Sequence, residues 1–306
     1  MERRRLHALA LAVTILLGVG CQSLGGPNGS SPEALQRLDG DTLTSIVAEL
    51  ELHLRDDSYR YDRALMADGR DVVAVSLWKL DRLQWLRAIP ESEWESTDLV
   101  VEFARARALE RLRRYDEANA AFERVAASGS ILGAPAFEAA GVMARFSESA
   151  NATGEGVEHE AAELRSRMAR WRGLAREYAD TSYQPLALEE AEAWQMLLVD
   201  WLRRTQGSER AISSCRRLIE QNRNSKLYAR HLIRLGDLYA DLARTVHLRS
   251  RTLKRLDVER YEQLVDGALA AYELAAEDRR PSLRDEASTR IEALLAAHRG
   301  TLAYAQ

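Results

Sequence analysis

The chain lacks the patterns that mark most nucleotide-binding enzymes and most β-sheet proteins. Its 306 residues contain no GxxxxGK[ST], GxGxxG, GxSxG or HExxH motif, so nothing predicts a phosphate-binding loop, a serine nucleophile elbow or a zinc protease site. After Pro32 there is no sustained alternation of apolar and polar residues, and Gly-Asn and Asp-Gly turns are few. Strands are therefore not expected.

Metal-binding and nucleophilic side chains are sparse as well. The six histidines show no pair at a spacing of four. The run between Glu155 and Glu163 has four glutamates and His159, but a di-metal helical bundle needs Glu-x-x-His twice, and this run does not provide it. We interpret it as a solvated helix N-terminus that the helix dipole favours, and Cys215 as a small buried residue. We predict no metal, no cofactor and no enzymatic activity.

The first 32 residues differ in composition from the rest. Arg3, Arg4 and Arg5 precede an apolar run over 6–17, which is the pattern of a secretory signal and is too short for a stable membrane span. The run ends in the sequence Gly-Val-Gly-Cys at 18–21. This resembles the lipobox of bacterial lipoproteins, although that family prefers leucine at the position of Gly18. The resemblance implies cleavage before Cys21 and lipidation of Cys21; the alternative is an ordinary signal peptide.

The residues after Cys21 suit a lipid-anchored domain. Positions 21–32 are rich in Gly, Ser and Pro, as in a flexible tether. Gln22 is not the aspartate linked to inner-membrane retention, so we expect an outer-membrane anchor facing the periplasm. Cleavage would remove three arginines and one glutamate from 43 basic and 47 acidic residues, leaving 40 and 46, a net charge of −6. This balance argues against nucleic acid as a partner, and a lipidated Cys21 leaves Cys215 no disulfide partner.

Beyond the tether, apolar residues recur at spacings of three and four, which predicts helices throughout. The breaks fall at glycines and prolines, including Pro90, Gly207 and Pro281. The expected helices are 33–54, 70–89, 97–112, 115–128, 135–149, 157–179, 185–204, 208–221, 226–249, 253–278 and 282–299.

Small and aromatic residues recur within these helices at fixed spacings. The stretch Leu-Gly-Asp-Leu-Tyr at 235–239 has a glycine that costs about 1 kcal/mol relative to alanine in a helix. We expect that Gly236 and Ala268 allow two helices to approach closely. The residues that carry the pattern are Ala118, Phe122, Gly141, Ala211, Leu235, Gly236, Tyr239, Ala268, Tyr272 and Ala275.

This pattern resembles the tetratricopeptide (TPR) repeat, in which a Leu-Gly-Tyr helix pairs with a small-aromatic-small helix. The resemblance implies an all-α, TPR-like α-solenoid of stacked antiparallel helical hairpins over 97–281. A helical region at 33–96 would precede it, and a capping helix and tail at 282–306 would follow. Any tightly packed antiparallel helix pair is the alternative explanation of the spacings.

Two surfaces are candidates for binding. Trp78 and Trp85, like Trp194 and Trp201, are seven residues apart and share a helix face, so they line either a groove or the core. Between Asp241 and Asp257 there is no acidic residue. Because Tyr239 and Ala268 lie 29 residues apart, we expect a projecting hairpin tip that contacts an anionic surface, or else a solvated end. The basic residues of that tip are Arg244, Arg249, Arg251, Lys254 and Arg255.

These features predict a lipid-anchored scaffold that binds protein partners of the bacterial envelope, in outer-membrane assembly or secretion. Its oligomeric state is not predicted. The alternatives are a peptidoglycan- or polysaccharide-binding protein and the non-catalytic helical part of a cell-wall enzyme.

Overall fold

The computed structural model describes residues 43–48, 50, 57–87, 90–151, 161–253 and 257–305. In this part of the chain, the only strand-like pairing is an isolated bridge between Leu65 and Asp71. Residues 43–48 are helical. The bounded helices that follow are α3 (Val72–Arg87), the 3₁₀ helix η1 (Glu91–Glu93), α4 (Ser96–Arg111), α5 (Tyr115–Ala127), α6 (Gly133–Asn151), α7 (Ala161–Glu177), α8 (Gln184–Thr205), α9 (Ser208–Gln221), α10 (Tyr228–Leu253), α11 (Val258–Ala276) and α12 (Pro281–Ala305). The predicted all-α class is confirmed.

Most predicted helix ends lie within a few residues of the observed ones, because glycine and capping residues set them. Gly129 and Gly207 have φ angles of +66° and +89°, a conformation that other residues rarely adopt. Gly129 lies in the turn before α6, and Gly207 lies in the turn before α9. Asp71 caps α3, since its Oδ1 accepts a hydrogen bond from the amide of Val73 at 2.8 Å. The breaks that the sequence places at these turns are therefore local properties of the chain.

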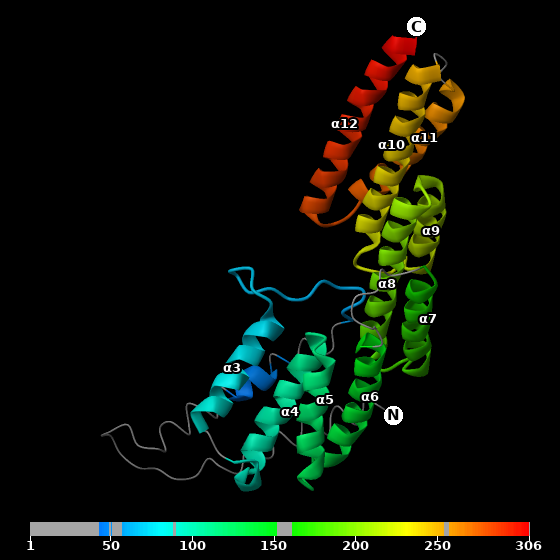
Figure 1. Cartoon of the computed structure of the whole chain (residues 1–306). Coiled ribbons are helices and arrows are strands. Elements are labelled where there is room, and N and C mark those ends of the chain that lie inside the picture. Colours follow the sequence, from blue (N-terminus) through cyan, green and yellow to red (C-terminus); the bar gives the residue numbers. More distant parts are fainter. Residues whose placement is uncertain are drawn as a thin grey trace. The chain divides into compact units, whose positions relative to one another are not determined.

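The chain divides into two compact units. The first holds residues 1–58, 62–155 and 178–186, and within it α3 packs on α4, α4 on α5, and α5 on α6 (Figure 1). A row of edge-to-face aromatic rings joins these helices, with Phe103 5.5 Å from Phe122 and Tyr115 5.4 Å from Phe146. Consecutive packing of antiparallel helices is the arrangement predicted for a helical-hairpin solenoid.

The first unit also buries charge on α4. Glu110 is fully buried and accepts a hydrogen bond of 2.5 Å from Arg107. The guanidinium of Arg107 lies 5.8 Å from the ring centre of Tyr183, and burial raises the pKa of Tyr183 to about 12. The carboxylate of Glu102, also fully buried, accepts from Nε of Arg124 at 3.0 Å. These pairs compensate charges that would otherwise be costly to bury.

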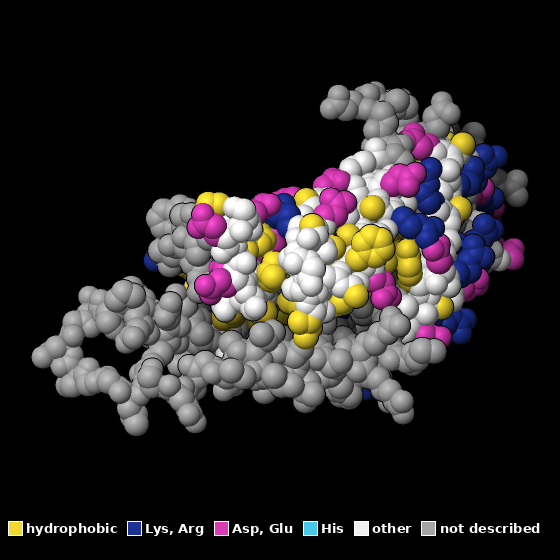
Figure 2. Space-filling view, turned by 90° about the horizontal axis from the view of Figure 1, so that it is seen from below, with side chains coloured by type: hydrophobic (Ala, Val, Ile, Leu, Met, Phe, Trp, Pro, Cys, Tyr) yellow, Lys and Arg dark blue, Asp and Glu magenta, His cyan; other side chains and the backbone are white. Residues whose placement is uncertain are grey.

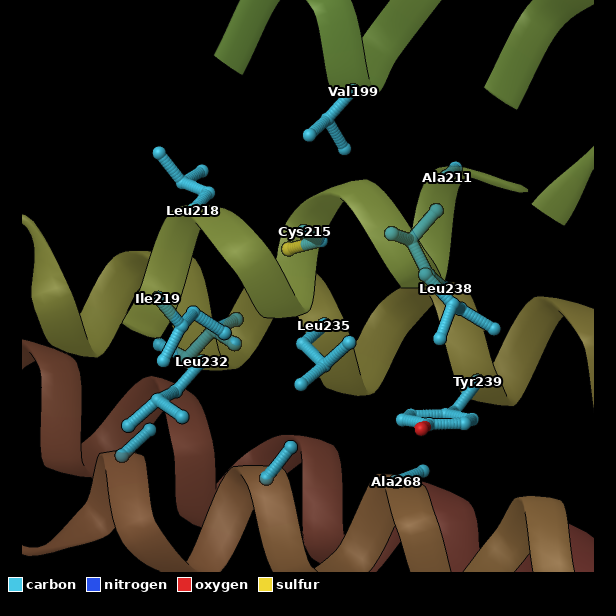
Figure 3. Close-up of a cluster of buried hydrophobic side chains, with 14 of the residues drawn as sticks. Val199, Ala211, Cys215, Leu218, Ile219, Leu232, Leu235, Leu238, Tyr239 and Ala268 are labelled. Carbon is cyan, nitrogen blue, oxygen red and sulfur yellow. The ribbon is translucent and has the colours of Figure 1, made fainter. Parts of the chain in front are cut away.

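The second unit holds residues 59–61, 156–177 and 187–306. In it α9 packs on α10, α10 on α11, and α12 on both α10 and α11. Figure 3 shows α10 between its neighbours: Leu235 lies near Cys215 of α9, and Tyr239 points toward Ala268 of α11. The predicted hairpin of α10 and α11 is thus present, and α10 is 26 residues, or about 39 Å, long.

Two glycines of this hairpin each face an aromatic ring of the opposite helix. A Cβ atom on Gly236 would lie 2.4 Å from Cε1 of Tyr272, and one on Gly267 would lie 3.2 Å from Cε1 of Tyr239. Position 236 therefore requires glycine in this packing, because the ring of Tyr272 occupies the space that a side chain would need. The close approach expected at Gly236 is thus present, and the side chain that it admits from the opposite helix is that of Tyr272.

We expect Gly236→Ala to destabilise the second unit by about 1–2 kcal/mol. The methyl group overlaps a ring that cannot move freely, because Tyr272 is 2% exposed and its hydroxyl donates to Asp237 at 2.8 Å. The control is Gly173→Ala on α7, where a Cβ meets nothing within 4 Å. That change should stabilise by about 0.5–1 kcal/mol through helix propensity. Urea unfolding measures both, and shifts of the same sign would contradict the close contact.

Candidate interaction surfaces

The residues predicted to pack between repeats are buried, with one exception. Gly141 is exposed, and a Cβ on it would meet nothing within 4 Å. The buried members of the set are Ala118, Phe122, Ala211, Leu235, Gly236, Tyr239, Ala268, Tyr272 and Ala275. The predicted helix contact at Gly141 is therefore wrong.

The error at Gly141 is one of register on α6. Phe137, four residues before Gly141, shares its helix face, and its side chain is 76% exposed. The buried stripe runs instead through Ala136, Ala140 and Met143. Phe137 is a large apolar side chain in water, and periodicity alone did not show that it lies off the core-facing stripe.

The four tryptophans do not form two equivalent pairs. Trp194 and Trp201 are partly buried against the core of the second unit, and the guanidinium of Arg167 lies 4.4 Å from the ring centre of Trp194. The core alternative thus holds for this pair. Trp78 is 59% exposed on α3, beside Arg82, while the side chain of Trp85 lies outside the described residues.

The basic end of α10 is partly described. The side chains of Arg244 and Arg249 are exposed, whereas those of Arg251, Lys254 and Arg255 lie outside the described residues. Two exposed apolar side chains accompany them, Leu248 on α10 at 53% and Val258 on α11 at 39%. The described part of this end therefore presents arginine and apolar groups together.

The same end is not a bare two-helix tip. The ring of Tyr261 on α11 stacks on His298 of α12 at 5.7 Å and lies 6.4 Å from His247 of α10. The predicted capping helix thus exists as α12, and it buries Leu283 and Ala287 at its other end. The expectation of a projecting pair of helices needs correction, because α12 packs beside both of them.

Clusters of metal-ligating side chains and long apolar helices were the remaining features to compare with the structure. The described residues contain no group of three or more His, Cys, Asp or Glu side chains that could hold a metal ion. In the glutamate-rich run, Glu163 forms an ion pair with Arg167 at 2.6 Å. The rest of that run, residues 155–160, lies outside the described residues. The predicted lipidation site, Cys21, lies outside them as well. Within the same described ranges, none of the helices combines the length and apolar composition that a membrane span requires.

Cys215 is expected to be inert toward thiol reagents in the folded protein. It is fully buried, and burial raises its pKa to about 12, so almost no thiolate forms at neutral pH. Labelling with iodoacetamide in a Cys21→Ser background should be slow at pH 7, should accelerate little at pH 9, and should become fast in denaturant. Fast labelling of the native chain at pH 7 would contradict the buried position.

A row of buried polar side chains on α8 escaped the sequence analysis. Glu189, Glu192 and Gln195 are three residues apart, each 3% exposed or less. Both oxygens of Glu192 are bonded: one accepts from Ser225 Oγ at 2.7 Å, and the other lies 2.6 Å from Nε2 of His231. The sequence signal for this row was the spacing of three between its polar residues. Polar residues at that spacing also occur on helix faces exposed to solvent, so the pattern did not distinguish the two cases.

Comparison of the chain with protein families, with curated proteins and with solved structures finds no match. The class is therefore defined by the fold itself: an all-α protein in which consecutive antiparallel helices pack as hairpins within each unit.

Proposed function

We propose that this chain is a lipid-anchored, TPR-like scaffold of the bacterial envelope that binds protein partners, in outer-membrane assembly or secretion. The observation that carries the proposal is the lipobox-like Gly-Val-Gly-Cys at 18–21, followed by a Gly/Ser-rich tether and then by helical hairpins. Lipid anchoring holds a domain at a membrane, and stacked hairpins offer extended surfaces to other chains.

Exposed apolar side chains support partner binding. Ile131 is 66% exposed in the turn before α6, and Phe137 is 76% exposed on α6 itself. Figure 2 shows that hydrophobic side chains gather on one face of the molecule, next to acidic ones. Apolar groups in such a setting are typical of protein interaction sites.

The experiment that tests the proposal is purification of the native protein from detergent-solubilised envelopes. A stoichiometric protein partner that survives washing supports the scaffold. The second candidate is a protein that binds peptidoglycan or another polysaccharide, and the exposed ring of Trp78 favours it. A glycan ligand with no protein partner would replace the first proposal with this one.

We further propose that the basic end of α10 contacts an anionic surface. Arg249→Glu, Arg251→Glu and Arg255→Glu together should weaken binding to vesicles with anionic lipid at least tenfold at low salt, since each basic residue near such a surface contributes about 1 kcal/mol. The loss should shrink as salt rises.

The control for the basic end reverses three exposed arginines elsewhere in the same unit, Arg223, Arg279 and Arg284, with the same change in net charge. Its binding to the vesicles should stay within about threefold of the wild type. Equal losses in the two variants would show that net charge alone acts, and the basic end would then have no specific role.

A further inference from the structure

Arg172, a partly buried residue of α7, forms its side-chain hydrogen bonds with neutral acceptors. Its Nη2 group donates to the amide oxygen of Gln195 on α8 at 2.6 Å and to that of Gln221 on α9 at 2.5 Å. Several other partly buried arginines pair with a carboxylate, among them Arg105, Arg107 and Arg124. Within the described ranges no acidic side chain pairs with Arg172, so its charge has no counter-ion there.

The amide groups that hold this guanidinium are themselves fixed. Gln195 is 3% exposed, and its Nε2 group donates to the amide oxygen of Gln221 at 3.1 Å. Its own amide oxygen also accepts from Nδ2 of Asn222 at 3.4 Å. The Arg172 guanidinium is therefore positioned before any ligand arrives, which lowers the cost of ordering it on binding. In the described part of the chain its Nη1 and Nε groups form no hydrogen bond, so they remain available to an outside acceptor.

A second arginine lies beside the first. Arg217 is exposed on α9, one helical turn before Gln221, so it shares a helix face with the residue that Arg172 contacts. Its guanidinium forms no ion pair or hydrogen bond with the described residues. Burial and then the like charge of Arg217 lower the pKa of Arg172. Two guanidinium groups from different helices are thus close enough to repel each other.

A third arginine extends the same face of α7. Arg176 follows Arg172 by one turn, and its Nε group donates to the main-chain carbonyl of Arg172 at 3.3 Å. Glu220 is the acidic residue of α9 nearest in sequence to Arg217, and the described structure shows no ion pair between them. The dipole of α7 does not replace a carboxylate, because it acts within the last turn and Arg172 lies five residues before the helix end. An outside anion would offset this repulsion.

The chemistry of the cluster matches a phosphate group. A guanidinium donates planar, charge-assisted hydrogen bonds to phosphate oxygens. A phosphate monoester carries a charge of about −1.5 to −2 at pH 7 and has three acceptor oxygens, so it can bind two arginines at once. A carboxylate has a single charge and two oxygens, which one guanidinium satisfies.

We propose that Arg172 and Arg217 form a binding site for a phosphate group, with Arg176 as a further donor at its edge. The site lies within the second unit and goes beyond the proposed function, since it depends neither on the lipid anchor nor on a protein partner. The phosphate belongs either to a small soluble ester or to a lipid headgroup.

The direct test is calorimetric titration of the full chain with inorganic phosphate at constant ionic strength, in a Cys21→Ser background. Arg217→Gln should weaken binding at least about tenfold, because one of two charged donors is lost. The matched control is Arg210→Gln, an exposed arginine of the same helix that donates to Gln206 at 2.6 Å. It makes the same change in net charge, and it should bind phosphate within about threefold of the unsubstituted protein.

The source of the phosphate is distinguished with vesicles of phosphatidylcholine, with and without phosphatidic acid. Weaker binding of Arg217→Gln than of Arg210→Gln to the phosphatidic acid vesicles would support the site and identify a lipid headgroup. Equal vesicle binding, together with the loss of free-phosphate binding in Arg217→Gln, would support the site and identify a soluble ester.

Thermal unfolding gives an independent readout of the repulsion. Without phosphate, Arg217→Gln should unfold at a higher temperature than Arg210→Gln, because it removes one of two like charges. With saturating phosphate the order should reverse, since a ligand that binds the folded state stabilises it. No phosphate binding by the unsubstituted protein, or equal binding by folded Arg217→Gln and Arg210→Gln with no reversal, would overturn the inference. That result would leave partner binding untouched, because envelope purification tests it separately.

Discussion

Cys21→Ser is expected to abolish the proposed lipidation completely. If Cys21 is the acylated residue, metabolic labelling with an alkyne fatty acid should mark the wild-type chain and leave the variant unmarked. The variant should then be recovered either in the soluble fraction or as the longer, uncleaved form, because serine cannot form the thioether that anchors the lipid. Click detection on gels of fractionated cells measures both properties.

The control for this experiment is Cys215→Ser, which removes the other cysteine of the chain. Because Cys215 is fully buried in the second unit, its loss should leave labelling and membrane association unchanged. A Cys21→Ser protein that is labelled and sediments with membranes as the wild type does would rule out lipidation at Cys21.

Glu192→Ala is expected to destabilise the second unit by about 3–5 kcal/mol. The change leaves the Ser225 hydroxyl and the Nε2 group of His231 without their acceptor inside the protein and creates a cavity on α8. Each of the three side chains is 7% exposed or less, so water does not readily replace the carboxylate. Urea unfolding followed by circular dichroism gives the loss.

Two variants make the Glu192 result interpretable. Glu273→Ala removes an exposed glutamate from α11 of the same unit and should change stability by less than about 0.5 kcal/mol. Glu192→Gln keeps the shape and one acceptor, so it should cost about 1–3 kcal/mol. A Glu192→Ala protein as stable as Glu273→Ala would show that the buried network contributes nothing measurable.

The helices and the long hairpin could be predicted because their determinants are local. Apolar spacing defines a helix, and a glycine such as Gly207 with a positive φ ends one. The spacing of Leu235, Gly236 and Tyr239 likewise indicated a packed face, and all three residues are buried. What the spacing did not give was the contact itself: the ring that fills the place beside Gly236 comes from Tyr272, 36 positions later.

The remaining features depend on tertiary contacts that no local pattern encodes. On α6, the helix face that begins at Ala136 and the adjacent face that begins at Phe137 both carry apolar or small residues. Packing against α5 determines that Ala136 is buried and Phe137 is exposed. Tyr59 lies in a non-helical stretch with no periodicity, and its partner Asn222 is 163 residues away. The association of α12 with the basic end of α10 is also long-range, whereas the projecting tip was expected only from the 29-residue separation of Tyr239 and Ala268.

The most direct test of the central claim is the mass of the mature N-terminus of the wild-type protein, purified from its membrane and digested to peptides. Lipid anchoring predicts a first residue at Cys21 that carries acyl chains on a glyceryl thioether, followed by Gln22 and Ser23. An N-terminal peptide that begins at an unmodified Cys21, or one that retains residues 1–20, would contradict the anchored scaffold.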